Sequence, residues 1–127
     1  MSVKVESDCV GYKEDRPWGS FETIELNRES EMSYKVKRIT ILPGKRLSLQ
    51  SHKHRSERWI CVSGTVVVES DSYNGDLGYG LHVSIPKGTI HRMANRTADP
   101  AVVIEVQFGE YLEEDDITRY EDDYGRG

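Results

Sequence analysis

The chain has 127 residues, of which 36% are hydrophobic and 31% are charged, and its formal net charge at pH 7 is -5. This length suits one domain with a core of its own, and the negative balance gives no support to nucleic-acid or membrane binding as a main role. Cys9 and Cys61 have neither C-x-x-C nor zinc-finger spacing. The first twenty residues contain no apolar run, and no stretch approaches the length of a membrane span, so we expect a cytoplasmic protein.

Short apolar stretches alternate with turns rich in Gly and Pro along the chain. Residues 1–15 are polar and predict a loose arm or an edge strand ahead of one domain over residues 16–127. The pattern then predicts short strands at residues 21–26, 34–42, 47–52, 59–62, 65–69, 81–85, 91–94 and 102–107, with a tight hairpin at Ser63-Gly64. Residues 70–80 predict a loop. The acidic tail, residues 110–127, shows neither the period of a strand nor that of a helix. The whole indicates an all-β antiparallel barrel or jelly roll.

The first segment with candidate metal-binding residues runs from Gly44 to Gly64. Gln50 and His52 are two residues apart, so in a strand they point to the same face. The polar residues 53–56 suit a turn, which can bring Glu57 back beside that pair. One carboxylate, one imidazole and one amide are therefore expected on a common face.

The second segment runs from Gly80 to Asn95. It contributes His91, which follows the turn Pro86-Lys87-Gly88. Together Gln50, His52, Glu57 and His91 offer the nitrogen and oxygen ligands of a site for one divalent metal. Zinc is the first expectation, and manganese, cobalt, nickel or iron are alternatives. The Gln50 amide has a second interpretation, because it can also form a hydrogen bond within the barrel.

Charge is unevenly distributed along the sequence. Residues 35–58 contain eight bases and one acid, and residues 110–123 contain eight acids and one base. One interpretation is two solvated faces that pack on each other. The other is a positive field around the metal motif that attracts an anionic substrate. The two interpretations are compatible.

The two segments resemble the paired motifs of the cupin superfamily, and the Gln-x-His arrangement resembles the metal site of phosphomannose isomerases. Further stretches resemble the C-terminal domain of type II mannose-6-phosphate isomerases, over residues 16–126. They are Arg16-Pro-Trp-Gly, Tyr34-Lys-Val-Lys-Arg-Ile-Thr, Leu47-Ser-Leu-Gln-x-His-x-His-Arg-x-Glu-x-Trp, Val62-Ser-Gly-Thr, Ile85-Pro-x-Gly, Ile104-Glu-Val-Gln, Tyr111-Leu-x-Glu-Asp-Asp-Ile and Tyr124-Gly-Arg.

The resemblance implies a cupin double-stranded β-helix, and an enzyme that interconverts mannose 6-phosphate and fructose 6-phosphate with a metal ion. It also implies that four residues matter for activity, namely Arg55, Glu57, Arg119 and Arg126. Proteins of this family often carry an N-terminal guanylyltransferase domain. The present sequence has no phosphate-cradling Gly-rich loop, so we do not expect it to synthesise GDP-mannose.

Aldose–ketose isomerisation needs a base that moves a proton between C1 and C2. His54 is the nearest candidate outside the ligand set, and it shares the face of His52 if that strand continues. A surface role for His54 is equally open. Lys37 and Glu105, on neighbouring strands, are weaker candidates.

Two other functions remain as alternatives: an isomerase or epimerase acting on another phosphosugar or sugar nucleotide, and a non-catalytic cupin that binds a sugar. By analogy with small cupins, whose exposed sheet edges are often covered by a second subunit, we expect a homodimer.

Overall fold

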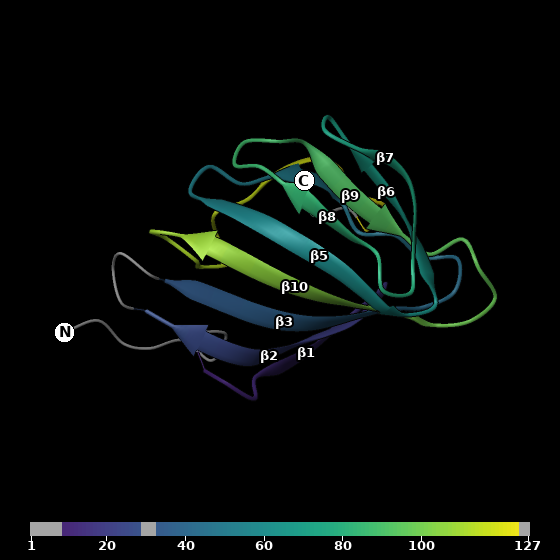
Figure 1. The fold of residues 1–127 in the computed structure, drawn as a ribbon, viewed down its shortest axis with the longest axis horizontal. Helices are drawn as coiled ribbons and strands as arrows, with labels where there is room; N and C mark the ends of the chain where they lie inside the picture. The colour runs from purple at the N-terminus through teal and green to yellow at the C-terminus, as the bar shows by residue number, and fades with distance from the viewer. Residues whose placement is uncertain (1–8, 29–32, 125–127) are drawn as a thin grey trace.

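The computed structural model describes residues 9–28 and 33–124, which form eleven strands and no helix (Figure 1). The strands are β1 (Lys13–Arg16), β2 (Gly19–Asn27), β3 (Tyr34–Ile41), β4 (Leu49–Ser51), β5 (Arg55–Ser63), β6 (Thr65–Ser70), β7 (Asn74–Gly78), β8 (His82–Ile85), β9 (His91–Ala94), β10 (Ala101–Gly109) and β11 (Thr118–Glu121). In the described part of the chain there is no helix long and apolar enough to cross a membrane.

These strands form two antiparallel sheets, which confirms the predicted all-β class. The larger sheet has the order β1-β2-β3-β10-β5-β8, and the smaller has the order β11-β4-β9-β6-β7. The expected hairpin at Ser63-Gly64 is wrong, because β5 and β6 belong to different sheets. Gly64, at φ 75°, turns the chain from one sheet to the other.

The main differences from the sequence-based expectation are one earlier strand start and two additional strands. β5 begins at Arg55, so the turn before Glu57 is shorter than predicted. The expected loop over residues 70–80 contains β7, which pairs with β6 at the sheet edge. Only Leu77 of that strand is buried, so its sequence has almost no alternating apolar signal. β11 lies in the acidic tail and pairs with β4.

The N-terminal arm is only partly described. Residues 1–8 lie outside the described residues, and Lys13–Arg16 form β1, which pairs with β2 at the edge of the larger sheet.

The three central strands of the larger sheet divide the interior into two halves. Alternate residues of β3, β5 and β10 are buried, as the pleat of a strand requires. One half of this buried surface is apolar: Ile39, Ile41, Trp59, Cys61, Ala101 and Val103. The other half, here called the polar half, consists of Lys35, Lys37, Arg55, Glu57, Glu105 and Gln107. Strand register places Lys37 opposite Glu105 and Gln107 opposite Glu57.

Residues 110–117, here called the cap segment, follow β10 and lie against the polar half. Leu112 is buried, and its carbonyl oxygen accepts a hydrogen bond of 2.7 Å from Lys35 Nζ. The carboxylate of Asp116 accepts hydrogen bonds from the backbone N–H groups of Lys53 and His54, both at 2.9 Å. The cap segment therefore joins the end of β10 to the turn that precedes β5.

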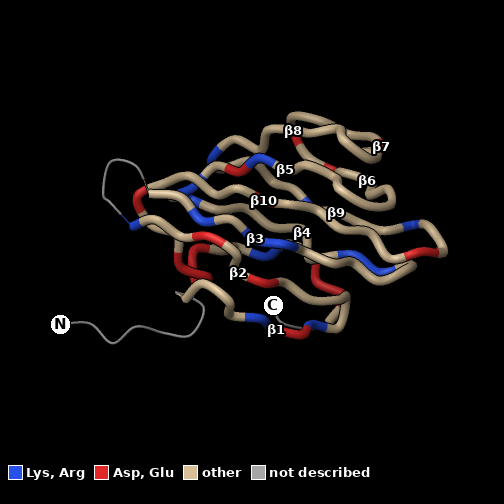
Figure 2. The backbone as a smooth tube through the Cα atoms, turned by 60° about the horizontal axis from the view of Figure 1, so that its bottom comes forward, with Lys and Arg blue, Asp and Glu red and all other residues tan. Residues whose placement is uncertain are grey.

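Ion pairs connect the basic and acidic parts of the sequence. Arg46 forms a bidentate pair with Asp123, with N–O distances of 2.7 and 2.9 Å, and Lys37 pairs with Glu114 at 2.8 Å. Basic and acidic segments that are far apart in the sequence are thus close to each other in the fold (Figure 2). The interpretation of two charged faces packed on each other agrees with these contacts.

The close approach of β10 to β5 gives a test of the fold beside the polar half. A Cβ atom on Gly109 would overlap the carbonyl oxygen of His54 and lie 2.9 Å from Arg55 Cα. We expect Gly109→Ala to lower the free energy of unfolding by about 1 to 3 kcal/mol, because backbone must move. Gly78→Ala, whose Cβ would have only Thr65 Oγ1 at 3.9 Å, is the control. Urea unfolding measures the free energy of unfolding of both variants. Equal stability of the two variants would contradict the prediction.

Candidate metal centre

Two imidazoles and one carboxylate meet inside the barrel. Their ligand atoms, from His52, Glu57 and His91, all lie within 4.8 Å of one another, and the three residues are buried. Glu57 comes from β5 of the larger sheet, His91 begins β9 of the smaller sheet, and His52 directly follows β4. The predicted convergence of these residues is therefore present in the structure.

Backbone carbonyl groups orient both imidazoles. His52 Nδ1 lies 2.6 Å from the carbonyl oxygen of Asp116, and His91 Nδ1 lies 2.9 Å from that of Thr89. A carbonyl oxygen can only accept, so each Nδ1 carries the hydrogen and each Nε2 is an acceptor, which in His52 faces Arg55 Nη2 at 3.2 Å. The Nε2 atoms face Glu57, at 3.3 Å for His52 and 3.9 Å for His91. Such supporting hydrogen bonds are typical of histidines that bind metals.

The cluster also has the charge states that a metal requires. Burial lowers the pKa of His52 to about 4, so its ring is neutral at pH 7. Burial alone would raise the pKa of Glu57, but the positive charge of Arg55 and neighbouring hydrogen bonds hold it well below its usual value. Arg55 Nε donates to Glu57 at 2.8 Å, and Trp59 Nε1 donates at 2.9 Å. A neutral His52 imidazole beside an ionised carboxylate fits a divalent cation.

Gln50 lies next to the cluster. It pairs with His91 across β4 and β9, and it lines the same cavity. Its amide nitrogen is 3.4 Å from the carbonyl oxygen of Ser48, which is a long hydrogen bond. The amide is therefore not strongly engaged elsewhere, and its role as a fourth ligand stays a prediction.

The cluster forms one wall of a cavity of about 620 Å³, counting the space open to solvent at its mouth. Charged side chains from both sheets and from the cap segment line this cavity. They are Arg16, Lys37, Arg55, Arg92 and Arg119 among the bases, and Glu57, Glu105 and Glu114 among the acids. The cations outnumber the acids, so an anionic ligand matches the charge of the wall.

Among the predicted catalytic residues, Arg55 and Arg119 line the cavity. Arg55 Nη2 lies 3.2 Å from His52 Nε2, and Arg119 pairs with Gln50 across β11 and β4. Arg126 lies outside the described residues. Whether any of these residues takes part in catalysis stays a prediction.

His54 does not lie with this group. Its exposed ring contacts Glu110 Oε1 at 3.2 Å and packs against Tyr111, in a separate surface groove. The expectation that it shares the face of His52 is wrong, because β4 ends at Ser51 and the chain bends at residues 53 and 54.

Glu105, which sequence analysis identified as a weaker candidate for the base, lies on the cavity wall in contact with Glu57. Burial first, and then the negative charge of Glu57, raise the pKa of Glu105 to about 8. Sequence reasoning missed Glu114 and Asp116, which lie in a tail without clear periodicity. The available signal was the pair of apolar residues Leu112 and Ile117 among acids, which indicates a segment packed on the barrel.

Comparison with known proteins identifies related sequences. The family model described as mannose-6-phosphate isomerase C-terminal matches residues 6–122. The alginate biosynthesis protein AlgA of Pseudomonas aeruginosa is 48% identical over 97% of this chain and 24% of its own length. The mannose-1-phosphate guanylyltransferase ManC of Salmonella typhimurium is 44% identical over 87% of this chain and 22% of its own length. The chain thus spans about a quarter of the length of these curated relatives.

Solved structures share the fold at low sequence identity. A protein with a double-stranded β-helix domain from Klebsiella pneumoniae matches with a TM-score of 0.65 and 16% identity, over 80% of this chain and 78% of that one. A Cupin 2 conserved barrel domain protein from Salinispora arenicola matches with a TM-score of 0.54 and 20% identity, over 66% of this chain and 81% of that one. These likenesses confirm the predicted cupin double-stranded β-helix.

Metal binding tests the cluster directly. We expect His52→Ala and His91→Ala to weaken Zn²⁺ binding by more than the roughly 10- to 100-fold that loss of a supporting group costs, because each removes a ligand. His82→Ala, on the exposed edge strand β8, is the matched control and should bind as the unaltered chain does. Isothermal titration calorimetry measures the affinities. If His52→Ala and His91→Ala bound Zn²⁺ as tightly as His82→Ala and the unaltered chain, the cluster would be refuted as the metal site.

Proposed function

We propose that this chain, which belongs to the family of mannose-6-phosphate isomerase C-terminal domains, is a metal-dependent isomerase that interconverts mannose 6-phosphate and fructose 6-phosphate. One observation carries this proposal: a buried cluster of His52, Glu57 and His91 opens into a cavity whose wall has an excess of cations. Such a site combines a metal for the sugar oxygens with positive charge for a phosphate.

The reaction moves one proton between C1 and C2 and places negative charge on a substrate oxygen. His52, Glu57 and His91, with Gln50 as the fourth candidate, would hold the metal, which when bound supplies a Lewis acid for the C1 and C2 oxygens. Arg55 lies beside the cluster, where its guanidinium can stabilise the same developing charge. Its remaining buried donor, Nη1, has no hydrogen-bond partner among the described residues.

Glu105 is the group best placed to move the proton. Of the three carboxylates on the cavity wall, Glu57 belongs to the metal cluster and Glu114 is paired with Lys37. Glu105 remains, and its Oε2 accepts a hydrogen bond of 2.9 Å from Gln107 Nε2, which fixes the carboxyl group. His54 is less suitable, because its ring lies outside this cavity.

A coupled assay of mannose 6-phosphate conversion tests the proposal. We expect metal-stripped protein to be inactive and activity to return when Zn, Mn, Co, Ni or Fe is added separately, since the reaction depends on the metal cluster. Replacing Glu57 with Gln should abolish this recovery. Stoichiometric metal binding without turnover for any metal would sink the isomerase assignment and favour a cupin that acts on another phosphosugar or only binds a sugar.

The identity of the base is tested by a pair of substitutions. Glu105→Gln should lower kcat by about 100- to 10,000-fold, the usual contribution of a general acid–base group. His54→Gln should cause a smaller loss, because its side chain is outside the cavity. Both variants are assayed at equal metal occupancy, so that a change in metal affinity is not mistaken for a change in chemistry. A greater loss in His54→Gln would reverse the assignment.

A further inference from the structure

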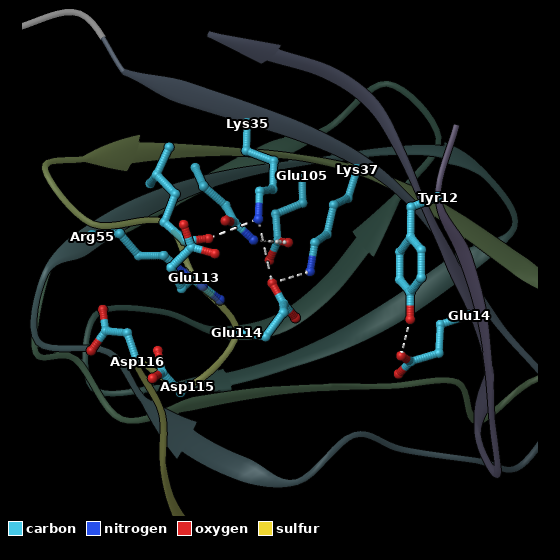
Figure 3. A network of polar contacts seen from close by, with 12 residues as sticks. Tyr12, Glu14, Lys35, Lys37, Arg55, Glu105, Glu113, Glu114, Asp115 and Asp116 are labelled. Atoms are coloured by element: carbon cyan, nitrogen blue, oxygen red, sulfur yellow. Dashed lines mark hydrogen bonds and ion pairs between the residues drawn. The ribbon is translucent and has the colours of Figure 1, made fainter. Parts of the chain in front are cut away.

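The cap segment inserts one carboxylate into the polar half of the barrel. Glu114 Oε2 lies 2.8 Å from Lys37 Nζ and 3.7 Å from Lys35 Nζ (Figure 3). Lys35 is fully buried and Lys37 is 4% exposed, and both come from β3. Glu114 belongs to a different part of the chain, 77 residues after Lys37.

Electrostatics make this location a strong anion site. Two buried ammonium groups need a compensating negative charge, because desolvation of an unpaired charge is costly. Burial would raise the pKa of Glu114, but Lys37 and then Arg55 outweigh burial and lower it to about 2. Glu114 is therefore ionised at pH 7, and its negative charge occupies the position that the lysines favour for an anion.

The same location lies at a suitable separation from the metal cluster. Lys37 and Glu114 line the cavity that Glu57 also lines. β10 lies between β3, which carries Lys37, and β5, which carries Glu57. Two strand spacings amount to about 10 Å. A six-carbon sugar with its reacting carbons at one end and its phosphate at the other spans a distance of this order.

We propose that Lys37, supported by Lys35, is the subsite for the phosphomonoester group of the substrate, and that Glu114 is an internal anion that the ester displaces. The assignment of the ester as part of a sugar substrate rests on the proposed function. A phosphate dianion carries more charge and more acceptor oxygens than a carboxylate, so it can replace Glu114 on the two lysines.

Displacement of Glu114 would also affect the orientation of a residue in the metal cluster. Two residues further along the cap segment, the carbonyl oxygen of Asp116 holds His52 Nδ1 at 2.6 Å. The carboxylate of Asp116 meanwhile holds the backbone of Lys53 and His54. Entry of the ester at Lys37 therefore acts on the same segment that orients a metal ligand.

Inorganic phosphate is the probe for this subsite. It is titrated by calorimetry into the metal-stripped full chain, because phosphate also binds divalent metals. We expect Glu114→Gln to bind phosphate roughly tenfold more tightly than the unaltered chain, since one competing charge-assisted contact is removed. Phosphate should also raise the unfolding temperature of Glu114→Gln by more than it raises that of the unaltered chain. Glu110→Gln removes the same charge from an exposed position of the cap segment and should leave phosphate affinity unchanged.

A double variant keeps the test decisive. Lys37→Met combined with Glu114→Gln removes both members of the ion pair, and it should lose the gain in phosphate affinity. If Glu114→Gln does not fold, Glu114→Asp retains the charge on a shorter side chain and should bind phosphate more tightly than the unaltered chain.

The subsite is overturned by three results: equal phosphate affinity in Glu114→Gln and the unaltered chain, retained affinity in the double variant, or no phosphate binding in any variant. Its failure and that of the isomerase are separable. The expected order of phosphate affinities together with absent sugar turnover would support the subsite and refute the isomerase reaction.

Discussion

The burial of charge at one end of the barrel is the constraint on which the site depends. An ionised carboxylate away from water is stable only when donors and cations surround it. Glu57 has Arg55 and Trp59 as hydrogen-bond donors and two imidazoles at its side. Because these partners come from both sheets, the carboxylate fixes the position of one sheet relative to the other. The precision of the cluster is thus a property of the whole fold.

The two halves of the interior have complementary roles. Burial of the apolar half supplies the hydrophobic free energy of folding, and it offsets the cost of desolvating the charges of the polar half. The alternation of β3, β5 and β10 makes this division possible, because each strand carries both kinds of residue on the same face. The cap segment completes the polar half with a carboxylate and backbone carbonyl groups.

Strand period and turn length were sufficient for the fold class and for placing Glu57 beside His52, because they are local properties. The convergence of His91 on that pair was predicted from the two paired motifs. The sequence was not sufficient for His54, because the end of β4 depends on pairing with β9 and β11 and not on local alternation. β7 was missed for a similar reason: its strand conformation comes from pairing with β6. The position of Glu114 depends on how an acidic tail packs on distant lysines, which no local pattern reveals.

The contacts of Trp59 give the protein a built-in optical reporter. Its fully buried indole donates to Glu57, and its ring meets His91 edge-on with centroids 5.3 Å apart. One fluorophore is therefore in contact with two of the three candidate ligands. Intrinsic emission should respond to the binding of a cation, and a paramagnetic ion such as Co²⁺ should quench it. Occupancy of the centre can then be followed in real time, without a label and independently of turnover.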